Sequence, residues 1–133
     1  MSTNIPSNLR YTKDHEWVDR DENDDHVAVF GITDHAQAAL GDIVHIELPS
    51  VGDEYDVGDE IGIIESAKSA SEIYAPLKGK VIKVNHELDS HPEMVNESPY
   101  ENGWIVKIRI SDADELDSLL SSDGYQHFLD EGN

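Results

Sequence analysis

The apolar residues of this chain gather in short runs that are rich in β-branched side chains, and polar, turn-forming clusters separate the runs. Runs of this kind are typical of β-strands. They predict strands at 16–19, 26–30, 41–46, 61–64, 73–77, 79–84 and 103–108.

Helical spacing of apolar residues occurs in two regions. After Thr33, which can cap a helix, it predicts a helix over 34–40 that ends before Gly41. In 112–130 it predicts C-terminal helices, the first capped by Ser111 or Asp112, with a break at 122–124. The pattern therefore predicts a mainly β protein with a short helix after an N-terminal hairpin and helices at its C-terminal end.

A short internal repeat organises the middle of the chain. The six residues that begin at Gly41 and the six that begin at Gly79 share the pattern Gly-x-β-β-x-β, where β is a β-branched apolar residue. Such a repeat indicates two similar supersecondary units, which can form a small sandwich of two sheets about a pseudo-twofold axis. We expect a single domain over 1–133, with a flexible tail at 1–8, a pseudo-twofold β core at 41–110 and C-terminal helices at 112–130.

One lysine stands between two predicted strands with only small residues beside it. Lys68 would lie at the tip of a hairpin, and the flanking residues are Glu65, Ser66, Ala67, Ser69 and Glu72. The turn has no glycine, asparagine or proline, so ordinary hairpin chemistry does not specify it. Two interpretations are open: a solvated lysine, which is the usual fate of this residue type, and a modified or reactive amine that another protein must reach.

Charge narrows the classes of partner. The 133 residues include 29 Asp and Glu but only 9 Lys and Arg, which gives a formal net charge of −20. Nucleic acid is a poor partner because phosphate contacts need Lys and Arg, and an anionic membrane surface is disfavoured for the same reason. Acid excess of this size is typical of proteins from a salty cytosol, where salt screens the self-repulsion.

Several kinds of chemistry have no support in the sequence. There is no cysteine, which excludes disulfides, thiolate nucleophiles and zinc–thiolate sites. The seven histidines lie near acids but not at metal-binding spacing on a helix, and no phosphate-binding or nucleophile-elbow motif occurs. We therefore expect no metal and no active site of its own. No apolar run reaches membrane-spanning length and no signal peptide is evident, so we expect a cytoplasmic protein, and a monomer.

Separate motifs, in order, resemble the glycine cleavage system H protein, a family of lipoyl carriers. The resemblance runs from about Leu9 to Leu129. It is carried by the segments 11–18, 31–37, 40–44, 65–68, 73–76, 84–85, 96–100 and 103–104. The family usually reads Glu-Ser-Val-Lys-Ala around its lysine. Ala67 and Ser69 replace the valine and alanine here, and both keep the flanks small.

The resemblance implies a lipoyl-domain-like barrel-sandwich hybrid with lipoic acid in amide linkage to Lys68, and a carrier that is not itself an enzyme. In the family, the arm takes an aminomethyl group from the pyridoxal-phosphate glycine decarboxylase (P protein) to the tetrahydrofolate-dependent aminomethyltransferase (T protein). Dihydrolipoamide dehydrogenase (L protein) then reoxidises the arm, and a lipoate-attaching enzyme is a further partner. A cofactor dithiol would account for the absence of cysteine.

The resemblance also implies a surface cleft for the loaded arm, and the positions that match it are Glu16 and His35. Our hypothesis is that Glu16 or its neighbours hold the aminomethyl nitrogen by a charge-assisted hydrogen bond. The alternative is that both are ordinary surface residues. Surface acids, Glu65 and Glu72 in particular, would help partner enzymes orient the tip.

Other functions are weighed against this one. A biotin carrier normally has methionine on both sides of its lysine, and the lipoyl domain of a 2-oxoacid dehydrogenase normally reads Asp-Lys-Ala and lacks the N-terminal region and C-terminal helices. An H-like protein that donates lipoyl groups to other proteins stays open. A non-modified acidic binding module, possibly for metal, is the alternative from another class, and it predicts an unmodified Lys68.

The acidic composition gives a first testable prediction. The fold should be weak at low ionic strength and should recover in molar salt, because salt screens the repulsion among the carboxylates. Thermal unfolding followed from low to molar KCl should therefore give a Tm that rises with salt. A Tm independent of salt would contradict this interpretation.

Overall fold

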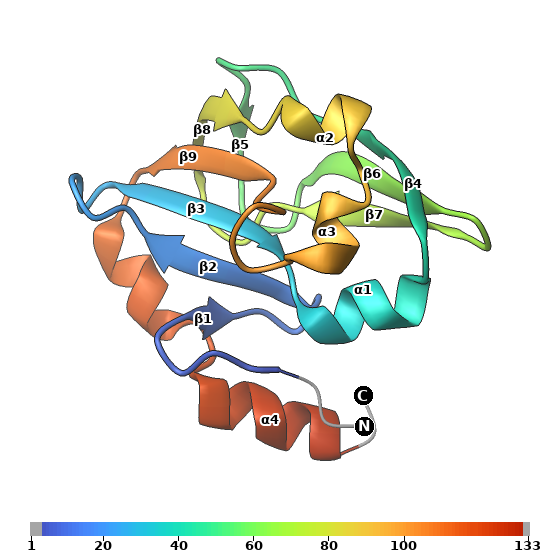
Figure 1. The fold of residues 1–133 in the computed structure, drawn as a ribbon. Coiled ribbons are helices and arrows are strands. Elements are labelled where there is room, and N and C mark those ends of the chain that lie inside the picture. The colour runs from blue at the N-terminus through green and yellow to red at the C-terminus, as the bar shows by residue number, and fades with distance from the viewer. Residues whose placement is uncertain (1–3, 132–133) are drawn as a thin grey trace.

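The strands of this protein form two antiparallel sheets. The computed structural model describes residues 4–131 (Figure 1). One sheet has the order β1-β2-β3-β9-β8-β5 and the other the order β4-β6-β7. The strands are β1 (Arg10–Tyr11), β2 (Glu16–Arg20), β3 (Val27–Ile32), β4 (Ile43–Glu47), β5 (Glu54–Tyr55), β6 (Glu60–Ser66), β7 (Ala70–Tyr74), β8 (Gly79–Val84) and β9 (Val106–Ile110). This arrangement confirms the expected mainly β, barrel-sandwich fold.

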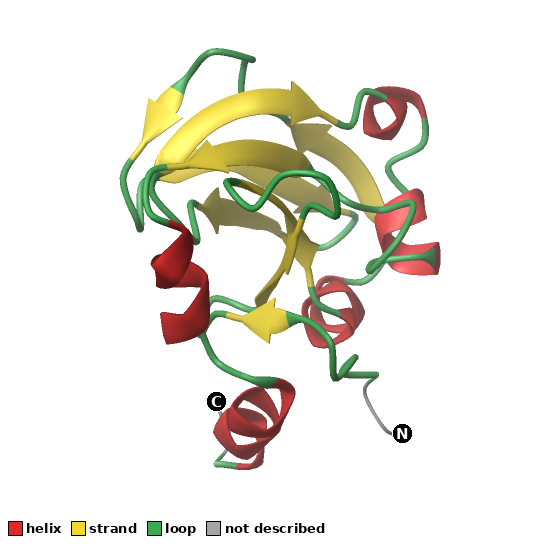
Figure 2. Cartoon of the chain, turned by 90° about the vertical axis from the view of Figure 1, so that its left-hand side faces the viewer, coloured by secondary structure: helices red, strands yellow, loops and turns green. Residues whose placement is uncertain are grey.

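Short helices lie around the strands (Figure 2). α1 (Asp34–Leu40) has the bounds predicted from sequence, and the Thr33 hydroxyl caps it by accepting from the Ala36 N–H. Two one-turn helices, α2 (Glu87–Ser90) and α3 (Met94–Glu97), occupy the linker between β8 and β9 and were not predicted. Each has a single buried apolar residue and no side-chain cap, so the sequence gives little helical signal there.

The C-terminal prediction needs one correction. Residues 113–118 form a 3₁₀ helix, η1 (Ala113–Ser118), capped by Asp112 as expected. The predicted break at 122–124 is wrong, because these residues are the first turn of α4 (Ser122–Asp130). Ser121 explains the error: its hydroxyl accepts from the Gly124 N–H at 3.1 Å and caps the helix, which makes a Ser-Asp-Gly sequence a helix start.

The internal repeat has a structural counterpart. β4 pairs with β6 and β8 pairs with β9, and both ladders shift register at the same repeat position, between Ile43 and His45 in one and between Val81 and Lys83 in the other. The residue inside each shift, Val44 or Ile82, is exposed by 57% or 36%. The repeat therefore encodes a β-bulge, which places the second of two adjacent β-branched residues outside the core.

Two apolar clusters hold the molecule together. The larger fills the space between the sheets and includes residues from β3, β4, β6, β8 and β9. The smaller is centred on Tyr11, Trp17 and Tyr125 and packs α4 beneath β1 and β2. None of the helices within 4–131 is long and apolar enough to cross a membrane. Of the tail predicted at 1–8, residues 1–3 lie outside the described residues, and Asn4 donates its N–H to Asp34.

Tyr125 joins three parts of the fold. Its ring stacks on Tyr11 with centroids 4.8 Å apart. Its hydroxyl lies 2.8 Å from His15 Nδ1, in the β1–β2 loop, and 2.8 Å from the hydroxyl of the α1 cap, Thr33. His15 has a φ of 65°. α4 is thereby tied to the β1–β2 loop and to the start of α1.

Removing only the Tyr125 hydroxyl tests this connection. Tyr125→Phe should lower the free energy of unfolding by about 1–3 kcal/mol, because the buried Thr33 hydroxyl and the His15 ring lose a partner that water cannot replace. Chemical denaturation at fixed salt measures the change. Tyr55→Phe is the matched control: its hydroxyl donates to an exposed Asp53 carboxylate, so the expected loss is below about 0.5 kcal/mol. Equal losses in the two variants would contradict the assignment.

Candidate functional site

Lys68 lies at the tip of the β6–β7 hairpin, as predicted. β6 ends at Ser66 and β7 begins at Ala70, so Lys68 is the middle residue of the connection. Lys68 and its neighbours Ala67 and Ser69 are all exposed. In Figure 1 this hairpin projects beyond the rest of the sheets. A protein that approaches the tip therefore meets the lysine with no bulky side chain on either side of it.

Ser66 specifies the turn, in place of the glycine, asparagine or proline that the sequence lacks. Its hydroxyl accepts from the Lys68 N–H at 3.2 Å and from the Ser69 N–H at 3.0 Å, and donates to the Ser69 carbonyl at 3.1 Å. The Ser66 N–H donates to the same carbonyl at 2.7 Å. A serine hydroxyl has one donor and two acceptor positions, and this turn uses all of them.

The tip is also held from outside the hairpin. The Ala67 N–H donates to the Asp42 carbonyl at 3.0 Å, in the segment that joins α1 to β4. Gly41, just before it, has a φ of +85°. A Cβ on Gly41 would lie 3.1 Å from Lys68 Cε and 3.5 Å from Nζ. The stem of the lysine therefore crosses Gly41 where a side chain would obstruct it.

A cavity of about 170 Å³ is lined in part by Leu40, the residue that precedes Gly41. Its apolar wall comes from α1, β3 and β6, and includes Ile32, Ala36, Leu40 and Ile64. Its acidic lining consists of Asp14, Glu16 and Glu72. The cavity can thus enclose an apolar chain and present carboxyl groups to a cation.

Glu16 is the buried acid of this cavity, with 2% of its surface exposed. One carboxyl oxygen accepts from the Tyr74 N–H at 3.0 Å, and the other accepts from the Thr12 hydroxyl at 3.3 Å. No Lys or Arg within 4–131 forms an ion pair with it. Burial therefore raises the pKa of Glu16 to about 8, and the charge of Asp14 adds to the increase.

His35, the second residue expected in the cleft, does not line the cavity. Its ring lies against that of His15, with centroids 4.7 Å apart, and His15 is the histidine that lines the cavity. Burial, followed by the nearby His35, lowers the pKa of His15. His15 was not among the residues expected in the cleft, although it directly precedes Glu16.

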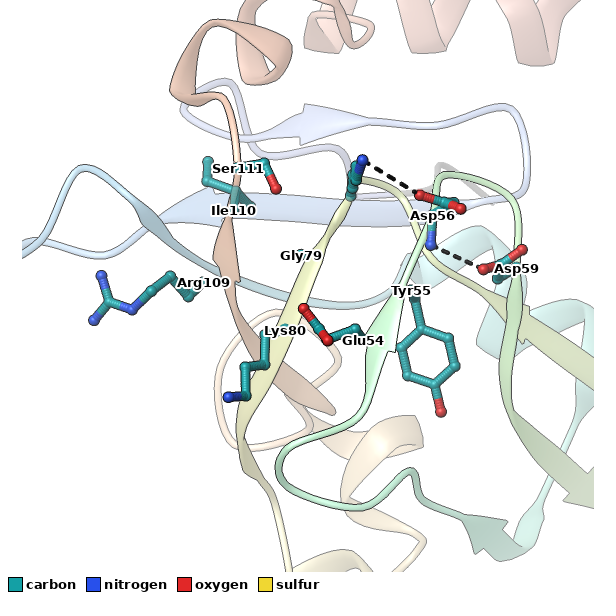
Figure 3. A pocket seen from close by; sticks show the side chains of 10 residues that line it. Glu54, Tyr55, Asp56, Asp59, Gly79, Lys80, Arg109, Ile110 and Ser111 are labelled. Atoms are coloured by element: carbon teal, nitrogen blue, oxygen red, sulfur yellow. Dashed lines mark hydrogen bonds and ion pairs between the residues drawn. The ribbon is translucent and has the colours of Figure 1, made fainter.

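A second hollow, of about 480 Å³, lies between β5, β8 and β9 (Figure 3). It mixes Glu54, Asp56 and Asp59 with Lys78, Lys80 and Arg109, and Lys78 pairs with Asp56 at 3.8 Å. It shares no lining residue with the cavity beside Lys68. Within the part of the chain that the structure describes, no three His, Asp or Glu side chains are grouped to hold a metal ion. The Lys68 tip, with its presented amine and the cavity that contains a buried carboxyl group, is therefore the candidate functional site.

Sequence and structure comparisons find the same kind of relative. The model of the family "Glycine cleavage H-protein" matches residues 9–132. A glycine cleavage system H protein from Photorhabdus laumondii is 50% identical over 129 residues, 97% of this chain and 98% of the relative. One from Chromohalobacter salexigens is 52% identical over 123 residues, 92% of each. The crystal structure of one from Mycobacterium marinum matches with a TM-score of 0.85 and 32% identity, over 97% of this chain and 100% of that chain.

The raised pKa of Glu16 predicts a pH-dependent stability. Because the folded state holds this proton up to a pKa of about 8, while the unfolded chain releases it near 4.5, ionisation destabilises the fold as pH rises through that interval. The slope from this one group approaches about 1.4 kcal/mol per pH unit. Glu16→Gln should remove this slope, so the stability of the variant relative to wild type should increase from pH 5 to pH 8. Parallel stability curves in chemical denaturation would contradict the assignment.

Proposed function

Since this chain belongs to the glycine cleavage H-protein family, the lipoyl carriers of the glycine cleavage system, we propose that Lys68 carries the lipoyl group in amide linkage. The supporting observation is the presentation of this amine: it stands at an exposed tip between small residues, and its stem crosses a glycine that leaves room for it. The family membership expected from the sequence motifs is confirmed by the comparisons.

The residues around Lys68 fit such a group. When attached, the lipoyl disulfide supplies the sulfur chemistry that accepts the aminomethyl group of glycine and passes it on. The chain itself has no cysteine that could do so. Ser66 fixes the turn through its hydroxyl, and Gly41 leaves the lysine stem unobstructed. A long arm on a fixed tip can reach successive partner sites, because the tether makes each encounter local.

The cavity beside Gly41 would receive the far end of the arm. Ala36, Leu40 and Ile64 supply apolar surface that excludes water, while Glu16 supplies a carboxyl group with no cation of its own. Near neutral pH this carboxyl holds its proton. A cationic amine brought into the cavity would favour the ionised form and convert Glu16 into the acceptor of a charge-assisted hydrogen bond. Asp14 and Glu72 line the same cavity and add to its negative potential.

The partners follow from this role. The family places the chain among the components of the glycine cleavage system. We assign it, as a carrier without catalysis of its own, to glycine decarboxylase, the aminomethyltransferase, dihydrolipoamide dehydrogenase and a lipoate-attaching enzyme. Glu65 at the end of β6 is exposed and would contribute to orienting these partners. The net charge of −20 favours a monomer, and it favours a salty cytoplasm as the environment of the protein.

The decisive measurement is the intact mass of protein purified from its native host, with peptide mapping across Lys68. One added lipoyl amide on Lys68 is the expected result. In vitro, Lys68→Arg should abolish lipoylation by a lipoate-attaching enzyme, because the guanidinium offers no equivalent amine. Lys78→Arg, which alters another exposed lysine, should leave it intact. Bare Lys68 in every molecule would contradict the proposal and favour a non-modified binding module.

A further inference from the structure

Asn96 bonds to three groups beneath the Lys68 tip. Its side-chain Nδ2 donates to the Gly41 carbonyl at 2.8 Å and to Gln37 Oε1 at 2.9 Å, and its Oδ1 accepts from the Ile43 N–H at 2.9 Å. Gln37 belongs to α1, and Ile43 begins β4. These three bonds use both donors and one acceptor position of the amide.

The segment that Asn96 holds is the one that supports the tip. Gly41 and Ile43 are the two residues on either side of Asp42, whose carbonyl accepts from the Ala67 N–H. Gly41 also lies under the Lys68 stem. The Gly41 carbonyl follows the end of α1, where backbone acceptors have no partner within the helix. Asn96 thus satisfies backbone groups at both ends of the segment while its middle residue anchors the tip.

Asn96 is itself held firmly. It lies in α3 next to Val95, which is fully buried. The Gly103 N–H donates to the Ser98 carbonyl at 2.8 Å, and a Cβ on Gly103 would come within 2.9 Å of Val95 Cα. The one-turn helix is therefore packed against the following loop so closely that only glycine fits there. A side chain mounted on such an element can fix the position of its partners.

We propose that Asn96 is the positioning residue of the lipoyl-attachment turn. It does not contact Lys68, and it acts through Asp42 and Gly41. By fixing the segment between α1 and β4 it limits the tip to the orientation in which the attaching enzyme meets the amine. This inference rests on the proposed function of Lys68, but its effect on the tip can be measured without any lipoyl group.

The three Asn96 hydrogen bonds would control how often the tip holds the orientation that the attaching enzyme binds. Without Asn96 the segment keeps its chain connections but loses three hydrogen bonds, so the Ala67 bond to Asp42 opens more often and the tip samples more orientations. An enzyme that binds one orientation then meets a smaller competent fraction, and its apparent affinity falls by that fraction. KM for lipoylation should rise while kcat, which reports the bound complex, stays unchanged.

Asn85 is a matched control. It is buried, whereas Asn96 is half-buried; its Nδ2 donates to the Asn102 and Trp104 carbonyls at 2.9 and 2.8 Å, and its Oδ1 accepts from the Glu87 N–H at 3.3 Å. Both asparagines therefore make two donated bonds and one accepted bond. Asn85 fixes the loop between β8 and β9, and none of its three bonds reaches the Lys68 tip or the segment beneath it.

The experiment compares unlipoylated wild type, Asn96→Ala and Asn85→Ala as full chains at a salt concentration where all are folded. Lipoylation by a lipoate ligase with lipoate and ATP is followed by mass. Amide hydrogen exchange reports the Ala67 and Ile43 N–H groups. Asn96→Ala should raise KM about 10-fold with kcat unchanged, and should speed exchange of the Ala67 amide. Asn85→Ala should lower stability to a similar degree with neither effect.

Each outcome decides the proposal. Unchanged KM and Ala67 exchange in Asn96→Ala, or equal changes in both variants, would overturn it and leave Asn96 as a stabilising residue only. If Asn96→Ala does not fold, Asn96→Asp replaces it, since that variant keeps the acceptor for Ile43 and loses both donated bonds. If wild type itself is not lipoylated, the proposed function fails, and the exchange of Ala67 still decides whether Asn96 positions the tip.

Discussion

The hydrogen bond between the Ala67 N–H and the Asp42 carbonyl is the contact on which the presentation of Lys68 depends. A hairpin that projects from a sheet is held by its own strands along its length but not at its tip. Here the tip is fixed internally by the Ser66 hydroxyl and externally by this one backbone bond. The α1 helix, its Gly41 terminus and the Asn96 side chain form the support on which that bond rests. The segment between α1 and β4, together with Asn96 from α3, thus supports the three exposed residues of the tip.

The second constraint is electrostatic. A chain with a net charge of −20 has abundant surface carboxylates, yet it also places Glu16 in its interior without a basic partner. Two hydrogen-bond donors, the Tyr74 N–H and the Thr12 hydroxyl, are too few to keep that carboxyl ionised at its ordinary pKa. Such a group destabilises the fold when it is charged and unpaired. Near neutral pH the carboxyl avoids this cost by keeping its proton, and a cation brought into the cavity would favour its ionised form instead.

The parts of this structure that follow from local patterns could be predicted from sequence, and the parts that need distant partners could not. Helix α1 was predicted with its bounds because Thr33 and Gly41 mark its ends within the segment itself. The Lys68 hairpin was predicted because two apolar strands border it. The role of the Ser66 hydroxyl in fixing the turn was missed, because the sequence of a turn does not show which backbone amides a serine will accept from. Asn96 is 53 residues from Ile43 in sequence, so no local pattern could connect it to the tip. His35 was expected in the cleft from the family motif alone, and its ring lies against that of His15, the histidine that lines the cavity.

The repeated bulge bears on whether other chains can pair with the edges of the two sheets. β4 is an outer strand of the smaller sheet, and β8 is covered by β5 and by residues 52–53, whose backbone groups bond to Val81. Unpaired strand edges invite other chains to add to the sheet, and a bulge interrupts the regular ladder that such addition requires. Val44 and Ile82 each stand at that interruption. By carrying the same irregularity in both halves, the fold makes the addition of another chain along β4, and along the part of β8 beyond Val81, less favourable.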